Sequence, residues 1–286
     1  MVNESRQPQI PLTEAIRRRT SCRAYNGLPL APEHLAMLKG IARSAPRLNA
    51  APVRFAFLEG VEQTEAILSG LVGSYGKTRG APLLLAGIAG PGQHRGESLG
   101  YAMEWLILEA TRHNIGSCWM SGTFDRQRLA GRIVLEEGEE VLAVSPLGYP
   151  SADADSALSQ KLVKTLVGAN KRKPLRDIVF TDYWGNSAEA LLVNRPDLQR
   201  MAEAVRLAPS AVNRQPWRLV ITPSIAVLAS VSKRSGLDNG IALCHWAIAA
   251  HEEGLSGTWD LNPDREALRQ ALRLPPRTAL IGVYPL

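Results

Sequence analysis

Apolar residues of this chain recur every three or four positions in some stretches and gather into short continuous runs in others. One amphipathic helix is predicted to begin at Pro32, and a second is predicted after Asn194, the expected N-cap. The faces expected to be buried carry Leu35, Leu38, Ile41 and Ala42 in the first helix, and Leu198, Met201, Ala202 and Val205 in the second. Two more stretches, near 99–114 and 239–253, are apolar on most faces, so each predicts a helix buried on most sides.

Five short apolar runs bounded by turn residues predict β-strands. They are residues 53–59, 82–90, 141–149, 218–222 and 279–284. Predicted strands and helices alternate along the chain, which indicates an α+β fold with layered α/β packing. The least structured stretch is PSADADSALSQKL, which begins at Pro150. We expect it to cross between two halves of the molecule.

The second half of the chain repeats the first in degenerate form. The stretch LGYAMEWLILEATRHNIGSCW resembles NGIALCHWAIAAHEEGLSGTW, and Trp119 falls on Trp259 at an offset of 140 (259 − 119). The loop SAPRLNAAPVRFAFL is a fainter copy of LAPSAVNRQPWRLVI, at an offset of 164 (216 − 52). The second half has therefore lost about 24 residues between these motifs (164 − 140), and the pattern indicates a tandem duplication.

We interpret the duplication as three segments within one compact unit. Residues 1–150 form a first repeat, 151–176 a crossing segment with a basic tail, and 177–286 a shortened second repeat.

Composition narrows the class of protein. The 286 residues are 45% hydrophobic and 21% charged, as in ordinary globular proteins. No apolar run approaches the roughly 20 residues that span a bilayer, and the polar start lacks the core of a secretory signal. Three scattered cysteines do not suggest a disulfide framework or a zinc site, so we expect a cytoplasmic protein without membrane association.

The net charge of +6 is concentrated in two basic clusters, RRRTSCR at 17–23 and NKRK at 170–173. Such clusters favour nucleic acid or a small phosphate, but a solvated surface explains each of them equally well. Neither cluster is interleaved with aromatic residues, as a groove for single strands would be, so no nucleic-acid partner is expected. The five histidines are scattered, which is typical of structural residues. The sequence contains no Gly-X-Gly-X-X-Gly motif and no P-loop.

Four motifs resemble the nitroreductase family of flavin enzymes. AIRRRTSCRAY (15–25, the arginine segment) is similar to the family's Arg-X-Ser-X-Arg opening, and NIGSCWMSGTF (114–124, the ring loop) to the loop beneath the flavin. SPLGYP followed by KRKPLRDIV (171–179, the basic tail) resembles the family's C-terminal tail. APSAVNRQPW (208–217, the proline loop) is very close to the family's Pro-Ser-X-X-Asn-X-Gln-Pro-Trp loop, but here it lies in the second repeat.

The resemblance implies a site for flavin mononucleotide (FMN). Arg19 is expected at its phosphate, with Thr20 beside it and the Ser21 hydroxyl at the phosphate or ribityl chain. Arg23 is expected at the pyrimidine edge, where a fixed cation stabilises the anion of the reduced ring. The other residues implied at the cofactor are Ser121 and Gly122, whose backbone N–H groups reach flavin N5; Lys171 and Arg172 at the phosphate; and Pro209, Ser210 and Asn213 from the proline loop.

Alternative interpretations accompany these assignments. Arg17 to Arg19 also suit a helix C-terminus, and Ser121-Gly122 also suits an ordinary turn. Gln215 is a candidate for holding the proline loop itself. Trp217 is expected in the core. Position 170 is Asn where the family's tail often has a basic residue, and Lys171 is the candidate to compensate.

Family members are usually homodimers whose FMN takes the arginine segment from one subunit and the proline loop from the other. Here the first half supplies the arginine segment, ring loop and tail, and the second half supplies the intact proline loop. The second half has no Arg-X-Ser-X-Arg near VFTDYWGNSAEAL, and the first half's proline loop has lost its polar residues. The chain therefore resembles the duplicated, single-chain TM nitroreductases, in which an intramolecular pseudo-dimer holds one FMN; this permits a monomer without requiring one.

The resemblance implies an FMN-dependent oxidoreductase that passes electrons from NAD(P)H to an electron-poor small molecule such as a nitroaromatic or quinone. The implied catalytic groups are Arg23, Ser121 and Gly122. A non-catalytic flavin-binding protein, for storage or sensing, is the alternative. A phosphate- or nucleic-acid-binding module is a third and weaker interpretation. The cover over the ring is expected from VGSYGKTRGAP (72–82), with Lys77 or Arg79 as residues that face the flavin.

Overall fold

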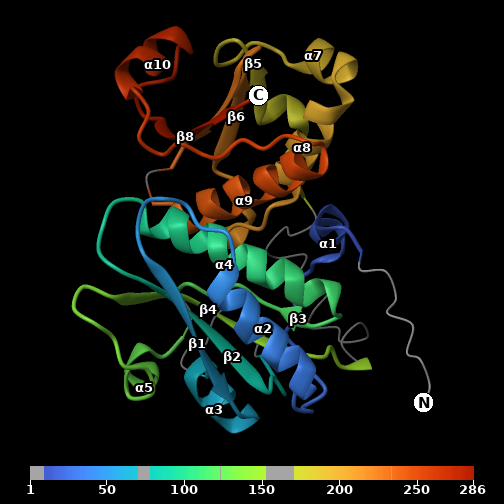
Figure 1. Cartoon of the computed structure of the whole chain (residues 1–286), viewed down its shortest axis with the longest axis vertical. Helices are drawn as coiled ribbons and strands as arrows, with labels where there is room; N and C mark the ends of the chain where they lie inside the picture. The colour runs from blue at the N-terminus through green and yellow to red at the C-terminus, as the bar shows by residue number, and fades with distance from the viewer. Residues whose placement is uncertain (1–9, 70–77, 123, 153–170, 233) are drawn as a thin grey trace.

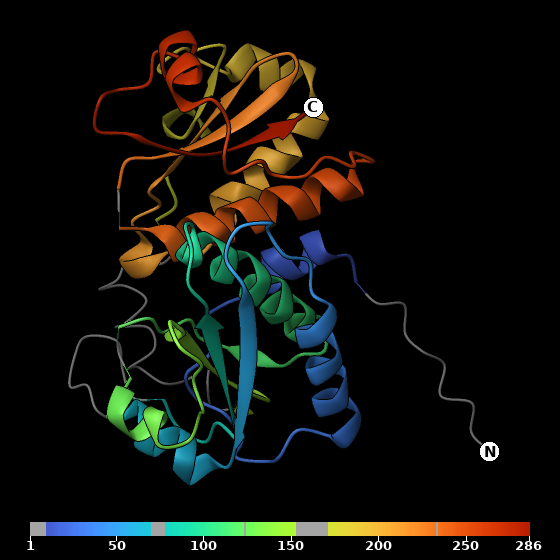
Figure 2. The same ribbon diagram turned by 60° about the vertical axis from the view of Figure 1, so that its left-hand side comes forward.

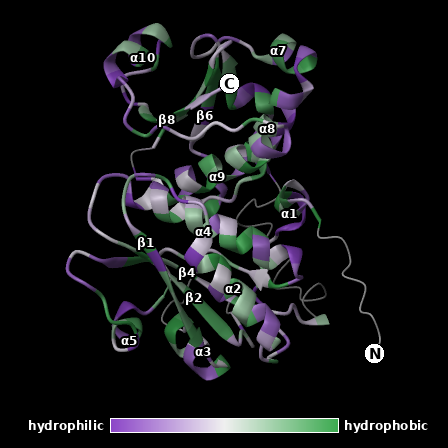
Figure 3. Ribbon diagram, viewed as in Figure 1, coloured by the Kyte–Doolittle hydropathy of each residue, from purple (hydrophilic) through white to green (hydrophobic). Residues whose placement is uncertain are grey.

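The computed structural model describes residues 10–69, 78–122, 124–152, 171–232 and 234–286. Two sheets lie toward opposite ends of the molecule, and two long helices, α4 (Arg95–Arg112) and α9 (Gly236–Glu252), lie between them (Figures 1 and 2). The strands are largely hydrophobic (Figure 3), and every residue of β2 (Leu83–Ala89) is buried. This arrangement confirms the layered packing of helix and sheet that the alternating pattern predicts.

The first half builds a four-stranded antiparallel sheet in the order β1-β2-β4-β3. Its remaining strands are β1 (Val53–Glu59), β3 (Gly116–Ser117) and β4 (Glu140–Gly148). Its other helices are α1 (Leu12–Arg18), α2 (Pro32–Ser44), α3 (Val61–Leu68) and α5 (Arg126–Ala130).

The second half builds a sheet in the order β5-β6-β7-β8, in which only the β5–β6 pair is parallel. Its strands are β5 (Val179–Thr181), β6 (Trp217–Ile221), β7 (Ile225–Ser230) and β8 (Ala279–Pro285). Its other helices are the 3-10 turns η2 (Leu175–Asp177) and η3 (Ala211–Asn213), with α7 (Glu189–Asn194), α8 (Pro196–Leu207) and α10 (Arg265–Ala271).

The two halves share one design down to the irregularities of their sheets. β1, β2 and β4 correspond to β6, β7 and β8, with the long helix inserted before the third strand. The register shifts between Gly87 and Ile88 in one sheet, and between Leu228 and Ala229 in the other. An isolated bridge from Met120 to Val144 likewise matches one from Asp260 to Val283. These matches confirm the degenerate duplication and the internal pseudo-dimer.

The missing residues of the second half lie between its first two matching strands. In the first half, α3 and the chain that follows it connect β1 to β2, whereas residues 222–224 alone connect β6 to β7. The second half has therefore lost the segment that corresponds to α3 and the predicted flavin cover. Lys77 lies outside the described residues, as does most of that cover in the first half.

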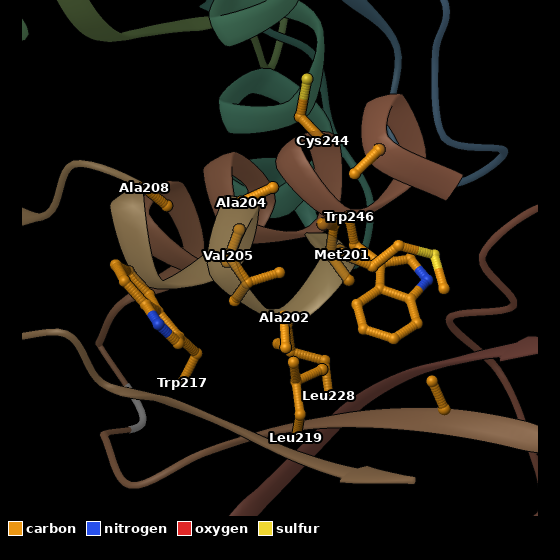
Figure 4. Packing of buried hydrophobic residues seen from close by; sticks show 14 of the residues in the cluster. Met201, Ala202, Ala204, Val205, Ala208, Trp217, Leu219, Leu228, Cys244 and Trp246 are labelled. Atoms are coloured by element: carbon orange, nitrogen blue, oxygen red, sulfur yellow. The ribbon is translucent and has the colours of Figure 1, made fainter. Parts of the chain in front are cut away.

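The halves meet where α4 and α9 cross at backbone contact. A Cβ on Gly100 would overlap the carbonyl oxygen of Leu237, and a Cβ on Gly240 would overlap that of Glu97. Only glycine allows so close an approach. On its outer side α9 packs against α8, and Ala202 of α8 faces Leu219 and Leu228 of the second sheet (Figure 4).

The predicted elements are found with small differences, and one N-cap assignment was wrong. Asn194 ends α7, and the N-cap of α8 is Arg195. The reason is Pro196, which occupies the first turn of α8 and forces the residue before it out of the helical region; Arg195 has φ −127° and ψ 81°. Trp217 is fully buried, as expected of a core residue. The strands β3, β5 and β7 were not predicted.

Candidate functional site

The arginine segment turns one of its arginines inward. Arg17 and Arg18, in the last turn of α1, are exposed and pair with Glu14. Arg19 follows the helix, and its side chain is only 6% exposed. Because α1 packs against α4, α8 and α9, the Arg19 guanidinium lies where the two halves meet. A role at the helix C-terminus therefore accounts for the exposed positions of Arg17 and Arg18, but it does not account for the burial of Arg19.

Beyond Arg19 the segment runs beside β3 at the open edge of the first sheet, and isolated β-bridges join it to neighbouring segments of the chain. Ser21 forms a parallel bridge with Ser117 of β3, and the Cys22 amide donates to the Ser117 carbonyl at 2.8 Å. The Arg79 amide donates to the Arg23 carbonyl at 2.9 Å. This pairing fixes the backbone that carries Ser21 and Arg23. Burial raises the pKa of the Cys22 thiol to about 11, so it packs here as a neutral group.

Three polar atoms in or beside this segment are buried and find no hydrogen-bond partner among the described residues. They are Arg19 Nη1, Arg23 Nε and Ser117 Oγ. A buried donor left in this state costs about 1–3 kcal/mol, so such groups call for a ligand or water. Thr20, which the resemblance also places at the cofactor, is exposed.

Glu104 of α4 joins the arginine segment to the ring loop and to the second half. Its carboxylate is fully buried and accepts from Trp119 Nε1 at 2.6 Å. It lies 3.8 Å from Arg19 Nε and 2.9 Å from His245 Nε2 of α9. The other ring nitrogen of His245 contacts the Ala204 carbonyl oxygen at 2.8 Å. The sequence motifs did not indicate Glu104 or His245 as members of the site.

The basic tail binds the end of α8 through Arg172. Its Nη1 donates to the Ala208 carbonyl at 2.6 Å and to Asn213 Oδ1 at 3.1 Å, and its Nη2 donates to the Leu207 carbonyl at 3.0 Å. Burial, and then the charge of nearby Arg19, lower the pKa of Arg172 to about 10. Arg19 thus lies near enough to Arg172 for its positive charge to disfavour the charged form of Arg172.

Hydrogen bonds hold the proline loop in a strained conformation. Val212, Asn213 and Gln215 have φ of 46°, 55° and 50°, values that non-glycine residues rarely adopt. The Gln215 side chain is buried, accepts from the Lys173 amide at 2.7 Å, and donates to the Lys171 and Asn213 carbonyls. Gln215 thus holds the loop, one of the two interpretations that its sequence position allows.

Two polar side chains of the proline loop that are predicted at the flavin also form hydrogen bonds within the protein. The Ser210 hydroxyl accepts from the Gln215 amide at 2.9 Å, and Asn213 Nδ2 donates to the Lys171 carbonyl at 3.0 Å. Pro209 precedes them and is half-buried. The structure thus brings the tail and the proline loop together, with Lys171 exposed at their junction.

The ring loop presents small, exposed residues. Ser121 and Gly122 are exposed, and a Cβ added to Gly122 would meet no atom within 4 Å among the described residues. Their backbone is therefore accessible to a flat ligand, although the next residue, Thr123, lies outside the described residues. Trp119 anchors the loop through its hydrogen bond to Glu104.

The decayed loop of the first half makes different contacts from the proline loop. Arg47, in the decayed loop, donates to the carbonyls of Ala42, Arg43 and Ala45, so it serves the end of α2 as Arg172 serves the end of α8. Leu48, at the position of Val212 (212 − 48 = 164), is buried in the core shared by both halves. In the decayed loop, Arg47 is therefore occupied by hydrogen bonds to the end of α2, and Leu48 is occupied by packing in the core.

A buried carboxyl group ties the proline loop to α9 and predicts a pH effect. Asp238 is 8% exposed, accepts from the Ala211 amide at 3.0 Å, and has its pKa raised by burial from 3.8 to about 6. A raised acid pKa gives stability that is fully present below about pH 4 and is lost as pH rises through 6. Asp238→Asn keeps an acceptor without the charge, so we expect it to raise the free energy of unfolding near pH 8 by about 1–3 kcal/mol and to have little effect near pH 4.

Denaturant unfolding at both pH values measures this difference. Asp260→Asn is the matched control, because Asp260 is exposed and also accepts a backbone N–H, from Asn262. Equal stabilisation by Asp238→Asn at the two pH values would show that its charge is not the cause.

Two other features, a metal site and a membrane-spanning helix, are absent from the described residues. No group of three or more His, Cys, Asp or Glu side chains could hold a metal ion there. No helix in the same residues is both long and apolar enough to cross a membrane.

Comparison with solved structures shows which fold the chain shares. A structure from Thermotoga maritima, determined as a putative nitroreductase, matches 100% of this chain and 97% of its own at a TM-score of 0.62 and 18% identity, which shows a shared fold. A nitroreductase of Bacteroides fragilis with bound FMN matches 51% of this chain and 90% of its own, with 23% identity and a TM-score of 0.42. A nitroreductase family protein of Clostridium novyi matches 62% and 97%, with 20% identity and a TM-score of 0.43.

No curated protein sequence matches the chain. The family model described as "Putative TM nitroreductase", however, matches residues 11–250, which is 240 of the 286 residues. The chain therefore belongs to this nitroreductase family.

Proposed function

We propose that this protein is an FMN-dependent oxidoreductase that passes reducing equivalents from NAD(P)H to an electron-poor small molecule of the nitroaromatic or quinone type. The observation that carries the proposal is that the nearly buried Arg19, from the first half, lies near Arg172, which is bound to the proline loop of the second half. Arg19 Nη1 and Arg23 Nε, both buried and without a partner among the described residues, fit the acceptor atoms of a phosphorylated flavin. The Bacteroides fragilis nitroreductase with bound FMN supports this choice of cofactor.

The residues that would hold FMN come from both halves. Arg19 and Arg172, with Lys171 beside them, would bind the phosphate through charge-assisted hydrogen bonds. Thr20 and Ser21 would lie along the ribityl chain. Those on the ring would be Arg23, the backbone of Ser121 and Gly122, and Pro209, Ser210 and Asn213.

Bound FMN would supply the chemistry of hydride transfer, and the protein would supply binding, orientation and electrostatics. Arg23 would keep a fixed positive charge at the pyrimidine edge, where it stabilises negative charge on the ring. The hydrogen bond from the Arg79 amide to the Arg23 carbonyl holds the backbone of Arg23 in place. At Ser121 and Gly122 small exposed residues would leave the backbone N–H groups free to approach the ring. The proline loop, rigid through Gln215, would cover the ring from the second half.

The internal duplication provides within one chain the interface that dimeric relatives build from two. A monomer is therefore a sufficient unit for the proposed site. We also propose that the protein acts in the cytoplasm, on small molecules.

Oxidation of NADH or NADPH by the FMN-loaded protein tests the proposed function. We expect consumption of at least one of them with menadione or nitrofurazone as acceptor, at rates well above those of FMN-free protein and of free FMN. Because the alternative is a flavin-binding protein without turnover, tight FMN binding with no oxidation above these controls would favour storage or sensing instead.

A further inference from the structure

Glu104 is an unexpected neighbour for a phosphate site. It is fully buried, and its Oε1 lies 3.8 Å from Arg19 Nε. An unpaired carboxylate here would cancel part of the positive charge that Arg19 offers to an anion and would repel a phosphate directly. The site therefore needs a partner that neutralises Glu104 without displacing it from Arg19.

His245 has the geometry of that partner. Its Nδ1 lies 2.8 Å from the Ala204 carbonyl oxygen, which can only accept, so Nδ1 carries a proton. Its Nε2 lies 2.9 Å from Glu104 Oε1. The Trp119 N–H at 2.6 Å and the nearby Arg19 charge both stabilise Glu104 as a carboxylate, so Nε2 donates as well. His245 is then an imidazolium, fully buried against a carboxylate.

The charges around the site then balance a phosphate monoester. Glu104 and His245 cancel, and Arg206, the other cation beside Arg172, is paired with Glu203 at 2.5 and 2.6 Å. Arg19 and Arg172 remain inside the site, with a joint charge of +2, while Lys171 is exposed and its charge is screened by solvent. A phosphate monoester carries about −1.5 to −2 near neutral pH, so the two arginines match it.

The pair belongs to the surviving site alone. At the offset of 140, position 104 corresponds to Cys244 (104 + 140) and position 245 to Trp105 (245 − 140). The symmetry-related place thus has a thiol and an indole where the site has a carboxylate and an imidazolium. Trp119 and Trp259 correspond in sequence, yet Trp259 donates to the Leu243 carbonyl and not to a carboxylate.

We propose that His245 is a positioning residue that neutralises Glu104, so that Glu104 can orient the Nε edge of Arg19 while the full charge of Arg19 and Arg172 remains available to the phosphate. The proposal rests on the proposed function and deepens it. It makes the His245–Glu104 pair a determinant of selectivity for FMN over riboflavin, which has the same ring but no phosphate.

Affinities of four proteins for FMN and riboflavin test the proposal. His245→Gln leaves the Glu104 charge unpaired, so we expect FMN affinity to fall about tenfold or more while riboflavin affinity changes less than about twofold. Glu104→Gln keeps an acceptor for Trp119 and offers an N–H to a neutral His245, so FMN affinity should stay within about threefold of wild type. The double variant should match Glu104→Gln, because no charge is left to neutralise.

The control is His251→Gln, which changes an exposed histidine on the same helix and should leave both affinities unchanged. Equal losses of FMN and riboflavin in His245→Gln, or no rescue in the double variant, would overturn the proposal by showing a purely structural role. Wild-type protein that binds neither flavin would instead overturn the proposed function, and this inference with it.

If His245→Gln does not fold, the wild-type protein still decides the question. Nitrogen NMR of protein labelled with ¹⁵N-histidine reports the protonation of each ring nitrogen, with a His245→Asn or Glu104→Gln spectrum for assignment. We expect both nitrogens of His245 to be protonated near neutral pH. A ring nitrogen without a proton would overturn the proposal.

Discussion

Replacing Arg19 by alanine is expected to weaken FMN binding by roughly 10- to 150-fold, the equivalent of about 1.5–3 kcal/mol for a hydrogen bond to a charged group. Arg19 is nearly buried, and its Nη1 has no partner among the described residues, so the group is held ready for an anion. Riboflavin should bind the variant about as well as it binds wild type, because it lacks the phosphate. Titration with each flavin, followed by flavin fluorescence, measures both affinities.

Two matched variants separate this effect from a general loss of positive charge. Arg17→Ala and Arg18→Ala each remove one arginine from the same helix, but both side chains are exposed and paired with Glu14. Each should change FMN affinity by no more than about twofold at moderate salt, because exposed charges are screened. If the three variants behaved alike, the phosphate would not be bound by Arg19.

The second large effect concerns the symmetry-related place, which is expected to bind FMN at least about a hundredfold more weakly than the site. Burying a phosphate without counter-charge costs several kcal/mol. In the first half's decayed loop Arg47 is bonded to the end of α2, and Leu48 packs into the core. Cys244 stands where the site has Glu104, and the stretch VFTDYWG, which corresponds to the arginine segment, contains no arginine. One chain should therefore hold one FMN.

Periodicity predicted most of the secondary structure because it follows from which side chains are buried. The helix after Pro32 buries Leu38 and Ala42, and the run at 82–90 is a strand buried on both faces. β7 was not predicted, although Ile225–Ser230 is apolar, because the deletion leaves it only three residues after β6. The Asn194 cap failed because Pro196 outweighs a good capping side chain.

The sequence predicted residues of the candidate site only where they belong to a motif of the nitroreductase family. The inward turn of Arg19 depends on tertiary packing, since Arg17, Arg18 and Arg19 look alike in sequence. Glu104 and His245 are single polar residues on apolar helices, and 141 positions separate them in the chain. No local pattern reports such a contact. The positive φ angles of Val212, Asn213 and Gln215 were likewise hidden, because no glycine marks them.

Counting the flavins bound per chain tests the composite site most directly. FMN-free protein is titrated with FMN under conditions of tight binding, and wild type is compared with Arg19→Ala and with Arg47→Ala, which removes the arginine of the decayed loop that is bonded to the end of α2. We predict one FMN per wild-type chain, a large loss of affinity in Arg19→Ala, and no change in Arg47→Ala. Two FMN molecules bound per chain with equal affinity would contradict a single site built from both halves.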